Sequence, residues 1–66
     1  MGKELLDVGG VANMLEMGVS TVWAQVKTTN RFPKPFKIST RKTRWVASEV
    51  KEYLESLIRA RDLKYN

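Results

Sequence analysis

The stretch Phe32–Val46 reads FPKPFKISTRKTRWV and interrupts a chain whose other segments have helical periodicity. Pro33 and Pro35 each fix φ and remove a backbone donor, so a helix does not run through them. After them, apolar and cationic residues alternate over Phe36–Ile38 and again over Arg44–Val46, on either side of a five-residue polar connection. This pattern predicts a two-stranded antiparallel hairpin with a basic tip.

Two short helices are predicted before the hairpin. Leu5–Val8 is apolar and short, which predicts an edge strand or a lead-in that ends at Gly9-Gly10. Apolar residues then recur at helical spacing in Val11–Glu16 and, after a turn at Met17-Gly18, in Val19–Thr28. The second of these two helices has one apolar face and one face of small, polar and cationic side chains.

A longer helix is predicted after the hairpin, over Glu49–Arg61, with Ser48 as its N-cap. Glu55 and Arg59 are spaced for an i,i+4 ion pair, and Asp62–Asn66 is predicted to be a flexible tail. The apolar stripe that should face the core consists of Val50, Tyr53, Leu54, Leu57 and Ile58.

The predicted order is helix, turn, helix, basic hairpin and helix, which is the layout of a winged helix-turn-helix. The fold class is mainly α, with three helices and a two-stranded wing. A chain of 66 residues without repeats is one domain, predicted to span 1–66 with an ordered core over 5–61. Because so small a domain needs its large side chains inside, five of the six aromatic residues are predicted to pack in the core rather than to form a stacking platform for single-stranded nucleic acid. They are Trp23, Phe32, Phe36, Trp45 and Tyr53.

Positive charge is concentrated in the middle of the chain. The net charge is +5, from 12 Lys and Arg against seven Asp and Glu. Between Ser20 and Trp45 there are seven cations and no acidic residue. This segregation predicts a surface that follows phosphates, and therefore a polyanionic partner.

Composition also argues against other classes. The chain has no cysteine and no histidine, which excludes a disulfide scaffold and the usual zinc ligands. No nucleophile–base pair or glycine-rich phosphate loop is present, so the sequence predicts a protein that is not an enzyme and needs no metal, cofactor or small-molecule ligand. The N-terminal residues form no long apolar run. The expected location is therefore the cytoplasm, without membrane contact.

A family resemblance is carried by five segments: Val11–Leu15, Gly18–Trp23, Phe32–Ser39, Thr43–Trp45 and Ser48–Val50. Together they resemble the AlpA-like family of phage and prophage regulators, which is similar to the excisionases and to MerR-like winged helices. The resemblance covers about residues 5–57 and implies a small DNA-binding protein, bacterial or phage-encoded and associated with the nucleoid. Three positions depart from the family pattern: Glu16, where a turn glycine is common; Gly10, where an acidic residue often opens the helix; and Ala24-Gln25, where a cation is frequent.

In a helix-turn-helix the second helix enters the major groove of double-stranded DNA. The predicted base-reading residues are Ser20, Thr21, Ala24, Gln25 and Thr28. Gln25 can bond adenine bidentately, and Ala24 can meet a thymine methyl. Cations and threonines outside this set are predicted to hold the backbone or to form the wing contact. They are Lys27, Arg31, Lys34, Lys37, Thr40, Arg41, Lys42 and Arg44.

Two roles remain open within DNA binding: a transcriptional regulator of a mobile element, or an excisionase that bends DNA at an attachment site alongside an integrase. A third alternative of another class is a protein-binding anti-repressor module. Because one small module reads little sequence, several copies are expected side by side on tandem sites. Neighbouring copies are expected to contact each other head to tail, through charged side chains that point outward from the third helix. This contact would be weak in free solution.

Overall fold

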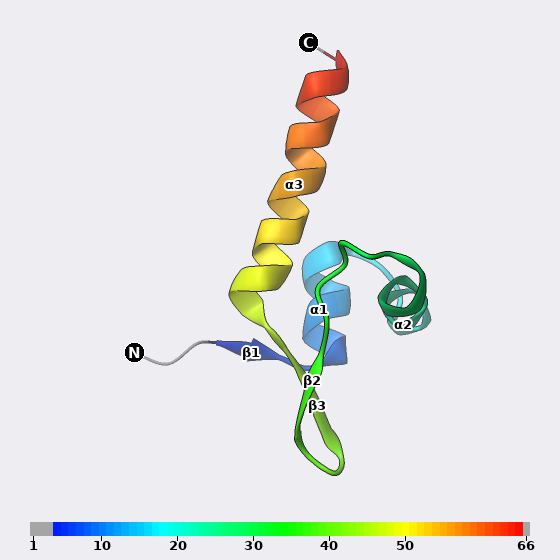
Figure 1. Cartoon of the computed structure of the whole chain (residues 1–66), viewed down its shortest axis with the longest axis vertical. Helices are drawn as coiled ribbons and strands as arrows, with labels where there is room; N and C mark the ends of the chain where they lie inside the picture. The colour runs from blue at the N-terminus through cyan, green and yellow to red at the C-terminus, as the bar shows by residue number, and fades with distance from the viewer. Residues whose placement is uncertain (1–3, 66) are drawn as a thin grey trace.

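The computed structural model describes residues 4–65 and has the predicted element order, preceded by a short strand (Figure 1). Three helices and a small antiparallel sheet give a mainly α, winged-helix-like fold, as predicted. The elements are β1 (Leu5–Leu6), α1 (Val8–Leu15), α2 (Val19–Thr28), β2 (Phe36–Ser39), β3 (Lys42–Val46) and α3 (Ala47–Tyr65).

The sheet has three strands in the order β1-β3-β2, one more than the two-stranded wing that was predicted. In β1, Leu5 pairs with Val46 and Leu6 with Trp45. The hairpin prediction was correct, but the connection is shorter than the five residues expected, because Ser39 already pairs with Lys42. The free edge of β3 offers backbone donors and acceptors that local sequence does not reveal, and β1 satisfies them.

Helix α1 begins at Val8, although the glycine pair was predicted to precede the helix. The Asp7 carboxylate caps this end by accepting a 2.8 Å hydrogen bond from the backbone N–H of Gly10. A Cβ at Gly10 would lie 3.1 Å from the Leu6 side chain, so the missing side chain lets the helix approach β1 closely. The glycines therefore belong to the first turn of α1, where the cap and this close approach offset their poor helix propensity.

Glu16 ends α1 in the left-handed conformation, with φ 55° and ψ 50°. The Met17 N–H donates to the Ala12 carbonyl at 3.0 Å, the 6→1 hydrogen bond of a Schellman-type helix end. Glu16 is the one non-glycine residue with positive φ in residues 4–65.

Helix α3 extends over Ala47–Tyr65 and exceeds its predicted bounds at both ends. It starts directly after β3, where the Ala47 N–H donates to the Glu4 carbonyl at 2.8 Å, so Ser48 lies inside the helix instead of capping it. At the other end, residues 62–65 are helical because no glycine or proline interrupts them. No helix within residues 4–65 has the length and apolarity needed to cross a membrane.

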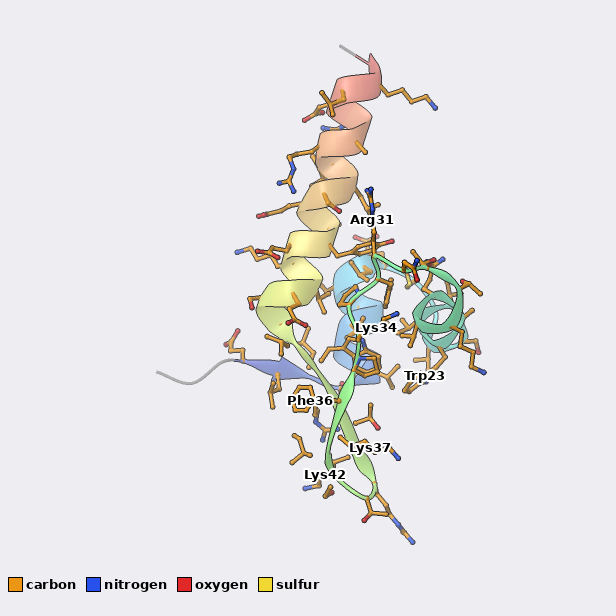
Figure 2. The ribbon with its side chains drawn as sticks, in the orientation of Figure 1. Trp23, Arg31, Lys34, Phe36, Lys37 and Lys42 are labelled. Atoms are coloured by element: carbon orange, nitrogen blue, oxygen red, sulfur yellow. The ribbon has the colours of Figure 1, made fainter. Side chains whose placement is uncertain are left out.

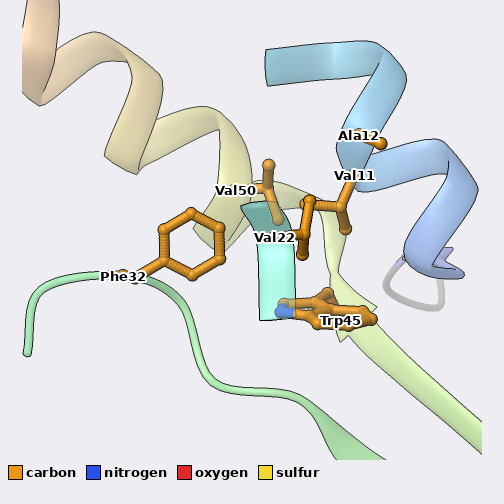
Figure 3. Packing of buried hydrophobic residues seen from close by; sticks show 6 residues of the cluster. All are labelled: Val11, Ala12, Val22, Phe32, Trp45 and Val50. Atoms are coloured by element: carbon orange, nitrogen blue, oxygen red, sulfur yellow. The ribbon is translucent and has the colours of Figure 1, made fainter. Parts of the chain in front are cut away.

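Within residues 4–65, the core consists of six buried hydrophobic residues, which come from every part of the fold except β1 and β2 (Figure 3). Trp45 is fully buried at the centre, as predicted, and its Nε1–H donates to the Pro33 carbonyl at 3.1 Å. The ring of Phe32 packs on Tyr53 with centroids 5.1 Å apart. This core fixes α2 and the hairpin relative to each other. Its members are Val11, Ala12, Val22, Phe32, Trp45 and Val50.

Candidate functional site

The solvent side of α2 carries most of the predicted base-reading residues. Val22 is fully buried against the core and Val26 is half-buried, which turns the opposite side of the helix outward. The exposed residues of that side are Ser20, Thr21, Ala24, Lys27 and Thr28. The first turn of α2 is preceded by Gly18, which has no capping side chain, so the free backbone N–H groups at this end are open to a phosphate.

Gln25 lies at the margin of this exposed side and is half-buried. Its Oε1 accepts a 2.6 Å hydrogen bond from the Thr29 hydroxyl, which fixes the orientation of the amide. The carbonyl keeps a second lone pair and the NH₂ group keeps its donors. Thr28 is more restricted, because its hydroxyl donates to the Ala24 carbonyl at 2.8 Å and can then act toward another molecule as an acceptor.

The wing is the β2–β3 hairpin, and its exposed tip is basic. Thr40 and Arg41 form the turn and Lys42 opens β3, all three exposed. Figure 2 shows Lys37 and Lys42 along the hairpin toward its tip. Arg44 differs from them because it is half-buried and donates from Nη1 to the Thr43 carbonyl at 2.8 Å. The tip is thus the freely accessible part of the wing.

The structure separates the predicted backbone-binding cations. Lys34 lies between α2 and the hairpin, whereas Arg31 lies at the far end of the loop, toward α3 (Figure 2). There Arg31 lines a groove together with acidic residues of α3, among them Glu49, Glu52 and Glu55. The surface of α2 and the wing therefore includes Lys34, whereas Arg31 lies at the groove beside α3.

Trp23 belongs to this surface, although the sequence predicted that it packs in the core. The same prediction was wrong for Phe36, which is 43% exposed on β2. Its side chain is 38% exposed on the side of α2 that faces the hairpin. The ring rests on Trp45 at a centroid distance of 5.3 Å, and its Nε1–H has no hydrogen-bond partner within residues 4–65. Val19, one turn earlier, is 45% exposed, so the apolar face of α2 is buried along one edge alone. The sequence held one signal of this exposure. Apolar residues at i, i+3, i+4 and i+7 cover a wide arc of a helix, so a residue at the edge of that arc, such as Trp23, lies at the border of the buried face.

No curated protein and no solved structure shows significant similarity to this chain. The family model described as prophage CP4-57 regulatory protein (AlpA) matches residues 5–59, which covers both helices of the helix-turn-helix, the wing and the first two thirds of α3. The chain therefore belongs to the AlpA family of prophage regulatory proteins.

Proposed function

We propose that this protein is a sequence-specific regulator of prophage genes that binds double-stranded DNA through α2 and the β2–β3 wing. The observation that carries the proposal is the acid-free run from Ser20 to Trp45, most of whose polar side chains are exposed on these two elements. A surface with one sign of charge attracts phosphates at long range and releases counterions on binding. Family membership supports the regulatory role.

In the proposed complex α2 lies in the major groove. Ser20, Thr21 and Ala24 reach base edges from its first turns, and Gln25 bonds a base with an amide that Thr29 holds in place. The wing tip with Arg41 and Lys42 follows the backbone into the neighbouring minor groove, where arginine is favoured. Further phosphate contacts come from Lys27, Lys34, Lys37, Thr40 and Arg44. Arg31 contributes through the overall field, because it lies among carboxylates.

Trp23 adds a contact at the corner between α2 and the wing. The strand that separates the two grooves passes this corner, and the free indole N–H can donate to one of its phosphates. Packing on Trp45 keeps the ring in place, so little rotamer freedom is lost on binding.

The direct test is a footprint on DNA flanking the protein's own gene, followed by gel-shift titrations at several salt concentrations. With about four to six phosphate contacts, log K falls with log salt at a slope of about −4 to −5. Protection at a promoter supports the regulator, and protection at an attachment site with strong bending supports the excisionase. Absence of duplex binding at low salt would contradict the proposal and favour a protein-binding module.

A matched pair of variants separates the wing contact from net charge. Arg41→Ala with Lys42→Ala should weaken binding to all duplexes alike and flatten the salt slope by up to about 2. Lys51→Ala with Arg59→Ala removes the same charge from α3 and should leave the slope nearly unchanged on a duplex that holds one copy. Equal slopes for the two variants would show that the wing is not a DNA contact.

A further inference from the structure

The C-terminal half of α3 projects beyond the folded body (Figure 1). At about 1.5 Å per residue, its 19 residues extend roughly 28 Å, which is more than half of the molecule's longest dimension of 45 Å. Val50 anchors the helix in the core at 0% exposure, and Tyr53 packs on Phe32. Beyond that point Leu57 and Ile58 are 47% and 43% exposed, although the sequence predicted a stripe buried along its length.

Charges along one side of this stripe alternate in sign. Lys51, Glu55 and Arg59 follow one another at intervals of four residues, and Asp62 continues the series. Within residues 4–65, α3 contains an ion pair between Arg61 and Asp62 at 2.7 Å, and neither Lys51–Glu55 nor Glu55–Arg59 forms one. Complementarity with the helix dipole does not explain the series, since that effect fades within the first and last turn.

We propose that two copies of this chain associate through their α3 helices, packed antiparallel around Leu54 and Ile58. Residue positions that face each other in an antiparallel pair add up to a constant. If Lys51 of one copy faces Asp62 of the other, Glu55 therefore faces the region of Ile58 and Arg59. Along one helix the charges read plus, minus, plus, minus, and along its antiparallel partner they read minus, plus, minus, plus. Each of the four charges therefore lies opposite an unlike charge.

The same charges disfavour the alternative arrangements. In a parallel, in-register pair each charge would face its own copy, which is repulsive along the whole series. The antiparallel pair is isologous, with the same patch used on both copies, so it closes at two. The head-to-tail contact predicted from the sequence would not close and would add further copies.

The association should be weak in free solution. A stripe of two or three apolar side chains is far smaller than the roughly 1,200–2,000 Å² buried by a stable specific interface. Pairing is therefore expected at high protein concentration, or when two copies are held close together on DNA. The contact does not involve α2 or the wing, so it stands independently of the proposed DNA complex.

Sedimentation equilibrium of the free full-length chain, from about 10 μM to about 1 mM, measures the association. We expect the mass to rise toward that of a dimer and no further, and to rise less at high salt. Ile58→Glu removes the apolar contact and places a carboxylate opposite Glu55 of the other copy, so it should weaken association at least about tenfold, which corresponds to 1.4 kcal/mol. Leu63→Glu is the matched control: Leu63 is 85% exposed but lies opposite Leu54 around the helix, so this variant should associate like the parent.

Charge exchange tests the alternating series. Lys51→Glu with Arg59→Glu makes it entirely negative, and Glu55→Lys with Asp62→Lys makes it entirely positive. Each variant alone should remain monomeric, and an equimolar mixture should recover association. Recovery shows that the charged side of α3 forms the contact; failure of the mixture, with both variants folded by circular dichroism, would overturn the proposal.

A spin label at Ser48→Cys decides the orientation, and the absence of native cysteine makes the labelling specific. The antiparallel pair separates two such labels by roughly 25 Å along the helix axis, whereas a parallel pair brings them to about 10 Å. A short label distance, a mass above that of a dimer, or a parent that stays monomeric at every concentration and salt would each contradict the antiparallel pair.

Discussion

Two tryptophans lie in contact but belong to different regions of the molecule. Trp45, in the core, is fully buried and its N–H is bonded to the Pro33 carbonyl. Trp23, on the surface between α2 and the wing, is 38% exposed with its N–H open. Among the described residues, the buried core consists of six hydrophobic side chains, whereas the basic surface spreads its cations over three segments. Replacing one core residue should therefore unfold the domain, whereas replacing one surface residue should leave it folded and measurably lower its affinity for DNA.

The largest effect is expected for Trp45→Ala. Large-to-small replacement of a buried aromatic typically costs about 3–5 kcal/mol, which is comparable to the total stability of a small domain. We expect this variant to be unfolded or to lack a cooperative thermal transition by circular dichroism. Trp23→Ala is the comparison and should keep a cooperative transition, because its ring is partly in water. If the thermal transitions of Trp45→Ala and Trp23→Ala were similar, the two tryptophans would not differ in their importance for the fold.

A smaller effect, on specificity, is expected for Gln25→Ala. Loss of a bidentate base contact typically costs about 1–3 kcal/mol of discrimination at one or two base pairs. The salt slope should not change, because no phosphate contact is removed. Thr29→Val should reproduce part of this loss by freeing the Gln25 amide, whereas Thr29→Ser retains the hydroxyl and should not. Competition gel shifts on duplexes substituted at single positions measure the discrimination.

Trp23→Phe should weaken DNA binding uniformly. The change removes the indole N–H and keeps an aromatic ring near Trp45, so a hydrogen bond to a charged phosphate is lost, worth about 1.5 kcal/mol. Titration of the variant against specific and random duplexes measures this loss, which should be equal for both. A change in base preference would instead place Trp23 against a base, and unchanged affinity would remove it from the interface.

The smallest effect is expected at the end of α1. Glu16 adopts a left-handed conformation that glycine enters without strain. Glu16→Gly should therefore stabilise the domain by roughly 0.5–1 kcal/mol, measured as a higher midpoint in thermal or urea unfolding. Glu55→Gly, in the middle of α3, is the same substitution at helical φ and should destabilise by about as much. If the unfolding midpoint shifted in the same direction in both variants, the conclusion that Glu16 is strained would be wrong.

Local sequence was enough to predict the parts of the fold that depend on local chemistry. The Pro33–Pro35 break, the alternation around Phe36–Ile38 and the helical spacing of Val19–Thr28 led to the correct elements, because each pattern acts within a few residues. The placement of Trp45 also followed, since a chain this short has few large side chains with which to fill a core. Composition likewise located the basic segment, and the matched family agrees with the resemblance.

Tertiary structure decided what depends on distant partners. The Ala47 N–H finds its acceptor in Glu4 and not in a cap at Ser48, and β1 adds a third strand to the sheet. Trp23 and Leu57 are apolar residues at helical spacing, and periodicity alone marks such residues as buried. Whether these residues are in fact buried depends on how far the rest of the chain extends along each helix. A domain with one thin core covers α3 near Val50 but not at Leu57, and leaves Trp23 open to the surface beside the wing.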